Sequence, residues 1–185
     1  NLDFRGFSGI ISSGTVTPGQ EIIVSPSEKT NRIKAISTFD GNLDKAIAGQ
    51  SVTLVLEDEI DISRGDLIAN IESPPDQTDQ FSAHLLWMHD EELLPERQYI
   101  MKIGAKTVTA VVTDLKHLIN VNTLEHTAAK TMKLNEVAYC NFSLDHAIGF
   151  DAYKEIRDTG AFILIDRYTN STVGCGMIDF GLRRA

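Results

Sequence analysis

The sequence predicts an all-β protein made of two consecutive β-barrels. Apolar and polar residues alternate with a period of two in several short runs, turn motifs separate these runs, and no segment keeps a helical apolar stripe beyond about two turns. Of the 185 residues, 42% are hydrophobic and 23% are charged, which is typical of folded globular proteins. A chain of this length forms one large domain or two small ones.

The predicted strands follow from the apolar positions within each run. Residues 51–56 alternate in the manner of a half-buried strand, and residues 107–113 repeat the pattern. In 138–144 the apolar face includes Cys140, which we therefore expect in the core. Residues 161–165 are apolar at every position, which predicts a central strand covered on both faces.

Turn motifs separate these strands. Thr17–Gln20 carries Pro and Gly at the central positions of a type II turn, and Asp40-Gly41 supplies residues that accept the positive φ of a hairpin turn. Gly104–Thr107 is expected to be a hairpin turn as well. Residues 91–98 and 126–132 could form short turns of helix at most.

We place a domain boundary in the polar segment Glu72–Asp79. Its two prolines cannot donate to a sheet ladder, and it joins two strand-rich halves. The predicted domains are a first barrel at 1–75 and a second barrel at 76–185. The chain starts at Asn1 and not at Met, so we expect it to be a piece of a longer protein.

The net charge of −9 is shared by both halves. Nucleic acids and anionic membranes require clustered basic residues, and Arg183 with Arg184 are too few to provide them, so neither is an expected partner. No apolar run approaches the ~20 residues of a membrane span. Cys140 and Cys175 lack a CxxC partner, which favours two reduced thiols in a cytoplasmic protein.

The stretch at 56–68, LEDEIDISRGDLI, holds five carboxylates. Read as a calcium loop starting at Asp61, it fails because Asp66 stands where the sharp turn needs Gly. The adhesion tripeptide Arg64–Asp66 needs an extracellular display loop, which nothing indicates. The expected role is structural: a solvated connection follows a strand, and Gly65 turns the chain into the closing strand.

Catalytic motifs are absent from the sequence. No GxSxG elbow occurs, and adjacent residues such as Asp145 and His146 are expected on opposite faces of a strand. Gly104–Thr107 contains Gly, Lys and Thr but lacks the GxxxxGK[ST] spacing of a P-loop. No pair at metal-ligand spacing occurs among the histidines: His84, His89, His117, His126 and His146. We therefore predict no catalytic, cofactor-binding or metal-binding residue in this chain.

Both halves resemble a known family. The segments FRGFSGIISSGTVTPGQEIIVSPS and AGQSVTLVLEDEIDISRGDLI resemble the second domain of translation-factor GTPases, and in particular that of the large, GTPase subunit of bacterial sulfate adenylyltransferase (ATP sulfurylase). The segments LNEVAYCNFSL and TGAFILIDRYTNSTVGCGMID resemble the third domain of that subunit, which is itself similar to the C-terminal barrel of elongation factor Tu. Cys175 departs from the family pattern, which has a small apolar residue there.

The resemblance implies a heterodimeric enzyme of sulfate assimilation. Its small subunit forms adenylyl sulfate and diphosphate from ATP and sulfate, and its large subunit hydrolyses GTP to drive this reaction. GTP and Mg would then bind a GTPase domain preceding residue 1, and ATP would bind the partner subunit. The implied partners are that GTPase domain and the small catalytic subunit. The ending GMIDFGLRRA also resembles the junction of bifunctional versions that continue into an adenylylsulfate kinase.

Four residues keep two interpretations each. We expect Asp166 and Arg167 on opposite faces of one strand, either in structural ion pairs or in functional contacts. Trp87 and Met88 fit either a barrel core or an interface anchor. For the whole chain, the alternative is a translation-factor-type module that binds protein or RNA, and the acidic charge argues against RNA.

Overall fold

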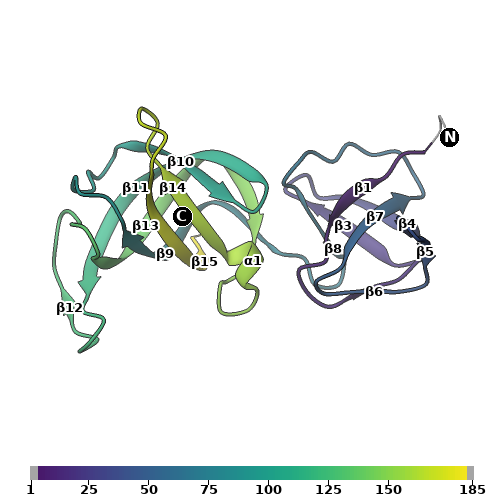
Figure 1. Cartoon of the computed structure of the whole chain (residues 1–185), viewed down its shortest axis with the longest axis horizontal. Coiled ribbons are helices and arrows are strands. Elements are labelled where there is room, and N and C mark those ends of the chain that lie inside the picture. The colour runs from purple at the N-terminus through teal and green to yellow at the C-terminus, as the bar shows by residue number, and fades with distance from the viewer. Residues whose placement is uncertain (1–3, 183–185) are drawn as a thin grey trace. The chain divides into compact units, whose positions relative to one another are not determined.

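The computed structural model describes residues 4–182 (Figure 1). The chain folds as two compact units, Asn1–Pro75 and Asp76–Ala185, and each unit has its own hydrophobic core. Strands dominate both, so the all-β prediction is confirmed. Asn1, Arg183 and Arg184, with the last residue of the kinase-junction resemblance, lie outside the described residues.

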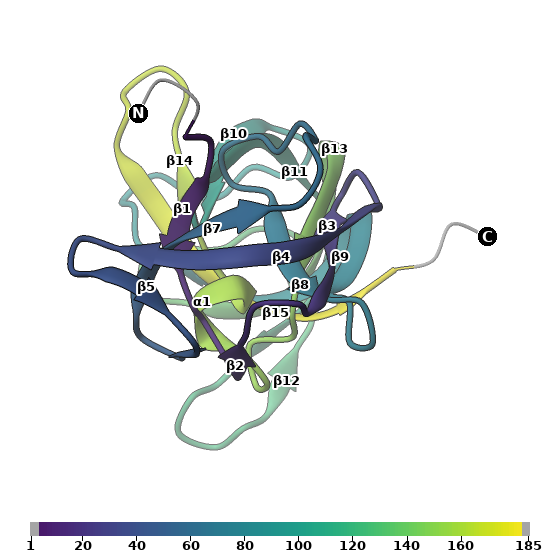
Figure 2. The same cartoon turned by 90° about the vertical axis from the view of Figure 1, so that its right-hand side faces the viewer.

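The first unit is a sheet that curls around a small aliphatic core (Figure 2). Its hydrogen-bonded order is β1-β7-β4-β3-β8, with β5 added to β4 and a separate pair β2-β6. Val52, Leu54 and Leu56 are buried at alternate positions of β7, as the alternation predicts. The strands are β1 (Phe7–Ile10), β2 (Thr15–Val16), β3 (Glu21–Ser25), β4 (Lys29–Thr38), β5 (Gly41–Leu43), β6 (Ala46–Ile47), β7 (Ser51–Leu56) and β8 (Leu67–Asn70).

Most turns of the first unit have glycine at the positive-φ positions that the sequence predicts. Gly19 has φ +85°, and Gly65 has φ +88° immediately before β8, which pairs with β3. The hairpin between β4 and β5 differs from the prediction, because Gly41 already pairs with Thr38. The central turn residues are therefore Phe39 and Asp40.

The second unit is a closed six-stranded barrel. The ladder runs β10-β14-β15-β9-β13-β11, and an additional β10–β11 pairing closes it, while β12 extends the sheet beside β11. Its elements are β9 (Asp76–Trp87), β10 (Gln98–Ile103), β11 (Lys106–Ile119), β12 (His126–Thr127), β13 (Val137–Phe150), α1 (Arg157–Gly160), β14 (Ala161–Ile165) and β15 (Thr172–Gly181).

Aromatic rings fill the interior of this barrel. The ring centroid of Phe81 lies 5.3 Å from that of Phe142 and 5.8 Å from that of Phe162. Cys140 is fully buried beside them on the inward face of β13, which confirms its predicted core position. Offset and edge-to-face aromatic contacts of this kind add stability beyond the burial of area.

Three features of the second unit differ from the sequence expectation. β14 is central, between β10 and β15, but Ile163 and Ile165 are only half-buried, so one face lacks the predicted cover. β9 begins at Asp76, inside the segment predicted to be a connection. The short helix α1 had no prediction. The part of the chain that the structure describes contains no helix long and apolar enough to cross a membrane.

Candidate functional site

Three loops of the second unit meet at one end of its barrel: residues 88–97, 130–136 and 166–171. Leu93 and Met132 form an isolated bridge that joins the first two loops, with the Leu93 amide 2.9 Å from the Met132 carbonyl. The third loop connects β14 and β15 and stands out from the barrel in Figure 1. We call this surface the loop end.

Buried side chains hold the loop end in place. Trp87, at the end of β9, is 2% exposed, and its indole Nε1 donates to the Glu91 carbonyl at 2.7 Å. Leu93 and Met132 are fully buried, and Thr131 Oγ1 donates to the Leu93 carbonyl at 2.5 Å. The loops are therefore anchored to the core although they lack regular secondary structure.

An ion pair ties the first loop to the third. Arg97 Nη2 donates to Asp166 Oδ2 at 2.5 Å, and the Asp166 side chain is only 8% exposed. The guanidinium also lies 5.8 Å from the ring centroid of Tyr99 and 5.7 Å from that of Tyr168. Arg97 thus combines a charge-assisted hydrogen bond with two cation–π contacts.

Asp166 also organises the loop that follows it. Its Oδ1 accepts hydrogen bonds from the Tyr168 amide at 2.8 Å and from the Thr169 amide at 2.9 Å. The Thr169 amide bond lowers the pKa of this carboxyl most, the Tyr168 amide and Arg97 lower it further, and burial opposes them. Asn170 has φ +58°, a conformation that Asn tolerates better than most residues.

The structure shows the contacts of the four residues that keep two interpretations in the sequence. Asp166 and Arg167 follow β14 and do not lie on opposite faces of it, so that expectation is wrong. The structural ion pair considered for Asp166 is present, and Arg167 instead donates to the side chain of Gln98. Trp87 is a core anchor, whereas Met88 is 40% exposed.

The surface of the loop end carries exposed apolar side chains and charges of both signs, including a Lys133–Glu92 pair at 3.9 Å. Four large apolar side chains are exposed there: Met88, Leu94, Leu134 and Tyr168. Four exposed carboxylates share the first loop with two of them: Asp90, Glu91, Glu92 and Glu96. Exposed apolar side chains on anchored loops are typical of interaction surfaces. No sequence signal indicated this cluster, since it depends on three distant loops meeting.

The acidic stretch of the first unit forms a surface network. Arg5 lies 3.3 Å from Glu59 and 3.5 Å from Asp61, and all three side chains are at least half exposed. Among residues 4–182, no group of three or more His, Cys, Asp or Glu side chains is placed to hold a metal ion. Exposed pairs of this kind contribute little stability.

The side chains of Asp145 and His146, which the sequence places on opposite faces of a strand, are in contact. His146 Nδ1 lies 2.7 Å from Asp145 Oδ1, because the pairing of β13 with β9 is irregular between Ser143 and Ile148. Both side chains are about half exposed. Gly104–Thr107 joins β10 to β11 as the predicted hairpin, and because no helix begins there it does not fit a phosphate-binding loop.

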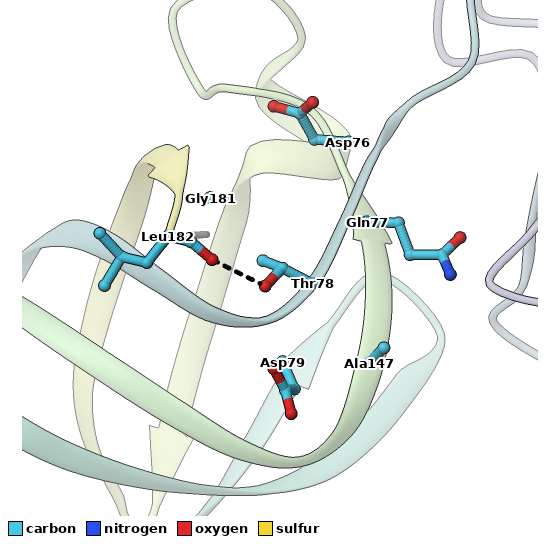
Figure 3. A pocket seen from close by; sticks show the side chains of 7 residues that line it. All are labelled: Asp76, Gln77, Thr78, Asp79, Ala147, Gly181 and Leu182. Atoms are coloured by element: carbon cyan, nitrogen blue, oxygen red, sulfur yellow. Dashed lines mark hydrogen bonds between the residues drawn. The ribbon is translucent and has the colours of Figure 1, made fainter. Parts of the chain in front are cut away.

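A cavity of about 540 Å³ lies at the edge of the second unit where β9 begins and β15 ends (Figure 3). Thr78 Oγ1, on its wall, donates to the Leu182 carbonyl at 3.3 Å. Its lining residues are Asp76, Gln77, Thr78, Asp79, Ala147, Gly181 and Leu182. None of the side chains singled out in the sequence as a candidate ligand or catalytic group lies in it.

Family models match both units and define the class of protein, the paired β-barrels of elongation-factor type. Residues 7–69 match the model of elongation factor Tu domain 2. Residues 80–179 match the model described as GTP-eEF1A C-terminal domain-like, and the chain belongs to that family.

The curated relatives are similar to this chain at much higher identity and have more specific names. The whole chain is 51% identical to the bifunctional enzyme NodQ of Rhizobium sp. (strain N33) and spans 29% of its length. Over 178 residues, 96% of the chain, it is 49% identical to sulfate adenylyltransferase subunit 1 of Shewanella woodyi and spans 38% of that protein. It is 47% identical over 182 residues, 98% of the chain, to the bifunctional enzyme CysN/CysC of Xylella fastidiosa, and spans 29% of it. The chain thus covers about a third of these relatives.

Solved structures confirm the fold. Sup35 complexed with GDP superposes with a TM-score of 0.86 at 17% identity, over 97% of this chain and 46% of that one. Translation elongation factor SelB from Methanococcus maripaludis superposes with a TM-score of 0.74 at 21% identity, over 95% of this chain and 39% of that one.

Proposed function

We propose that the chain is the barrel part of the GTPase subunit of a sulfate adenylyltransferase. The observation that carries this proposal is the identity of 46 to 51% with NodQ proteins over all 185 residues, matched by 49% with a sulfate adenylyltransferase subunit 1. The proposed domains are a barrel at 1–75 and a barrel at 76–185. The holoenzyme would work in the cytoplasm and form adenylyl sulfate and diphosphate from ATP and sulfate.

In this proposal the barrels carry no chemistry of their own. GTP and Mg²⁺ bind a GTPase domain that precedes the barrels in the parent protein, and ATP binds the small catalytic subunit. The barrels couple the two, since a domain packed against nucleotide-sensitive loops can adopt two orientations that differ little in free energy. An adenylylsulfate kinase domain follows in the parent if it is bifunctional like NodQ.

We assign the contact with the GTPase domain to the loop end. Leu94 and Tyr168 are 54% and 84% exposed, yet their loops are pinned by buried anchors and by the Arg97–Asp166 ion pair. Such a surface is preorganised, so docking costs little loop ordering. The four carboxylates of the first loop favour a partner surface with basic residues near its apolar contacts.

Domain deletion tests the function. A holoenzyme that lacks both barrels but keeps its GTPase domain should synthesise adenylyl sulfate without GTP stimulation. Normal GTP-coupled yield in that deletion would overturn the proposal.

A pair of matched leucines tests the docking surface. Leu94→Ala in the holoenzyme should lower GTP-stimulated adenylyl sulfate synthesis, because loss of an apolar side chain that anchors an interface costs about 1 kcal/mol of binding or more. Leu124→Ala is the control, since Leu124 is 72% exposed on the loop 120–125. Equal activity of the two variants would exclude the loop end while leaving the wider function intact.

The runner-up is a translation-factor module that binds protein or RNA. The similar solved translation factors are 17 to 21% identical and share the fold. RNA binding is disfavoured by the net charge of −9. A GTP-stimulated adenylyltransferase activity in the parent protein separates the two hypotheses.

A further inference from the structure

Four rings form a continuous row across four strands of the second unit, three of the barrel and the added strand β12. His84 on β9 and Tyr139 on β13 have ring centroids 5.0 Å apart. Tyr139 stacks on His117 of β11 at 5.7 Å, and His117 stacks on His126 of β12 at 4.0 Å with 16° between the planes. The row is built across strands, so no spacing in the sequence reveals it.

The last ring of the row sits on a lightly attached strand. β12 pairs with β11 at two positions, Leu118 with Thr127 and Ile119 with His126. The turn before it is closed by its own backbone bonds, such as the Leu124 amide to the Asn120 carbonyl at 2.7 Å. Figures 1 and 2 both show this segment as an arm that extends beyond the body of its unit.

The barrel does not depend on the arm. Leu118 and Ile119 also pair with Ala138 and Val137 on the opposite side of β11, so the ladder continues without β12. The chain returns to the core at Met132, which is fully buried. Ala129 packs against the same core, so the segment from 120 to 128 can swing away while both of its ends stay anchored.

Charged groups of both signs lie beside the row, and the pKa of His117 shows their net effect together with burial. The Lys116 ammonium lies 5.5 Å from the ring centroid of Tyr139, and His84 contacts the same ring. Asp179 of β15 supplies a carboxylate, which accepts a hydrogen bond from Tyr139 Oη at 2.9 Å. Burial lowers the pKa of His117 most, followed by His126, His84 and Lys116.

We propose that the stacked pair of His117 and His126 is an acid-sensitive latch that holds β12 against β11. With the His117 imidazole neutral, the rings stack and the arm is closed. When acid puts a proton on His117, its charge faces the second imidazole at a centroid separation of 4.0 Å and lies beside Lys116, and the arm opens. Opening leaves the outer backbone edge of Leu118 and Ile119 free, and an unpaired edge of this kind can accept another strand.

The direction of the effect follows from the lowered pKa of His117. A histidine whose pKa is lower in the closed arm binds protons more readily when the arm is open. Acid therefore favours opening below the ordinary histidine pKa of ~6.5. The ratio of open to closed arm rises about tenfold for each unit by which the closed-state pKa lies below the ordinary value, and levels off below the closed-state pKa.

Hydrogen exchange measures the latch directly. In the full-length protein, amide protection of residues 118–127, corrected for intrinsic exchange, should fall between pH 8 and pH 5.5 while that of β9 and β13 stays constant. His126→Phe keeps a stacking ring but removes the imidazole that faces His117, so its protection should change less with pH than that of the unmodified protein. His146→Gln is the matched control, because His146 lies outside the row and should leave the effect intact.

Two results would overturn the latch. One is a pH-independent protection of 118–127 in the unmodified protein. The other is an equal acid-induced loss in His126→Phe, which would show that other groups open the arm.

Discussion

The guanidinium of Arg97 and the carboxylate of Asp166 lie 2.5 Å apart although 69 residues separate them in the chain. Arg97 ends one loop and Asp166 begins another, so this pair fixes how two parts of the loop end meet. Because Arg97 is 31% exposed at its side chain, the pair lies at the boundary between core and solvent. Its contribution therefore exceeds that of an ordinary surface pair without the full desolvation cost of a buried one.

Replacing Asp166 should separate its two roles. Asp166→Ala removes the ion pair and the acceptor for two backbone amides, and we expect a loss of about 1 to 3 kcal/mol in the free energy of unfolding. Asp166→Asn keeps an acceptor for those amides and should lose less. Denaturant unfolding of the full-length protein measures both, with Asp40→Asn in an exposed turn as the control. Equal losses in the Ala and Asn variants would mean that the turn contacts contribute nothing.

Acid should weaken the second barrel through the same carboxyl. The pKa of Asp166 is lowered in the folded protein, with the Thr169 amide as the largest cause, so its stabilisation is present above the unfolded pKa of ~3.9 and is lost as pH falls below it. The difference in unfolding free energy between the unmodified protein and Asp166→Asn should shrink from pH 6 to pH 3. A difference that stays constant over this range would contradict the assignment.

Gly176 should not tolerate a side chain. A methyl group there would overlap the ring of Phe162, its cross-strand partner in the barrel interior. Gly176→Ala should therefore destabilise the protein by about 1 to 3 kcal/mol through overpacking. Gly9→Ala is the matched control, because no heavy atom lies within 4 Å of the added group. The measurement is the melting temperature of each of the two variants. Similar values for Gly176→Ala and Gly9→Ala would show that Phe162 moves aside freely.

The two thiols should differ in reactivity. Burial raises the pKa of Cys140 to about 12, so at pH 8 only about one molecule in 10⁴ carries the thiolate. Cys175 is half-buried on β15. An alkylating reagent should modify Cys175 in the folded protein and reach Cys140 only after unfolding, as peptide mass mapping would show. Rapid labelling of Cys140 under native conditions would indicate local opening of β13.

Strand positions were predictable where alternation is regular. The run at 51–56 matches β7 residue for residue. β11 and β13 extend well beyond their predicted runs, because bulges reset the alternation: the pairing of β11 is irregular between Val112 and Asp114 and again between Leu115 and His117. The start of β9 is polar and carries no apolar period at all.

The contacts of the candidate site could not be predicted from the sequence either. Its contacts join residues far apart in the chain, so they depend on register and barrel closure, which local periodicity does not encode. The sequence pattern places Asp166 on a strand, and it gives no signal for Arg97. The contact of His146 with Asp145 departs from the rule that neighbours on a strand point apart, because the strand pairing is irregular there.

The pairing of β9 with β15 has a consequence for biosynthesis. β9 opens the second barrel and β15 completes it, so the barrel cannot close until Gly181 has left the ribosome. The first unit needs only residues up to Asn70, where β8 pairs with β3. During translation the first unit can therefore fold while β9 waits with an unpaired edge, and this interval is when the nascent chain is most exposed to misassembly.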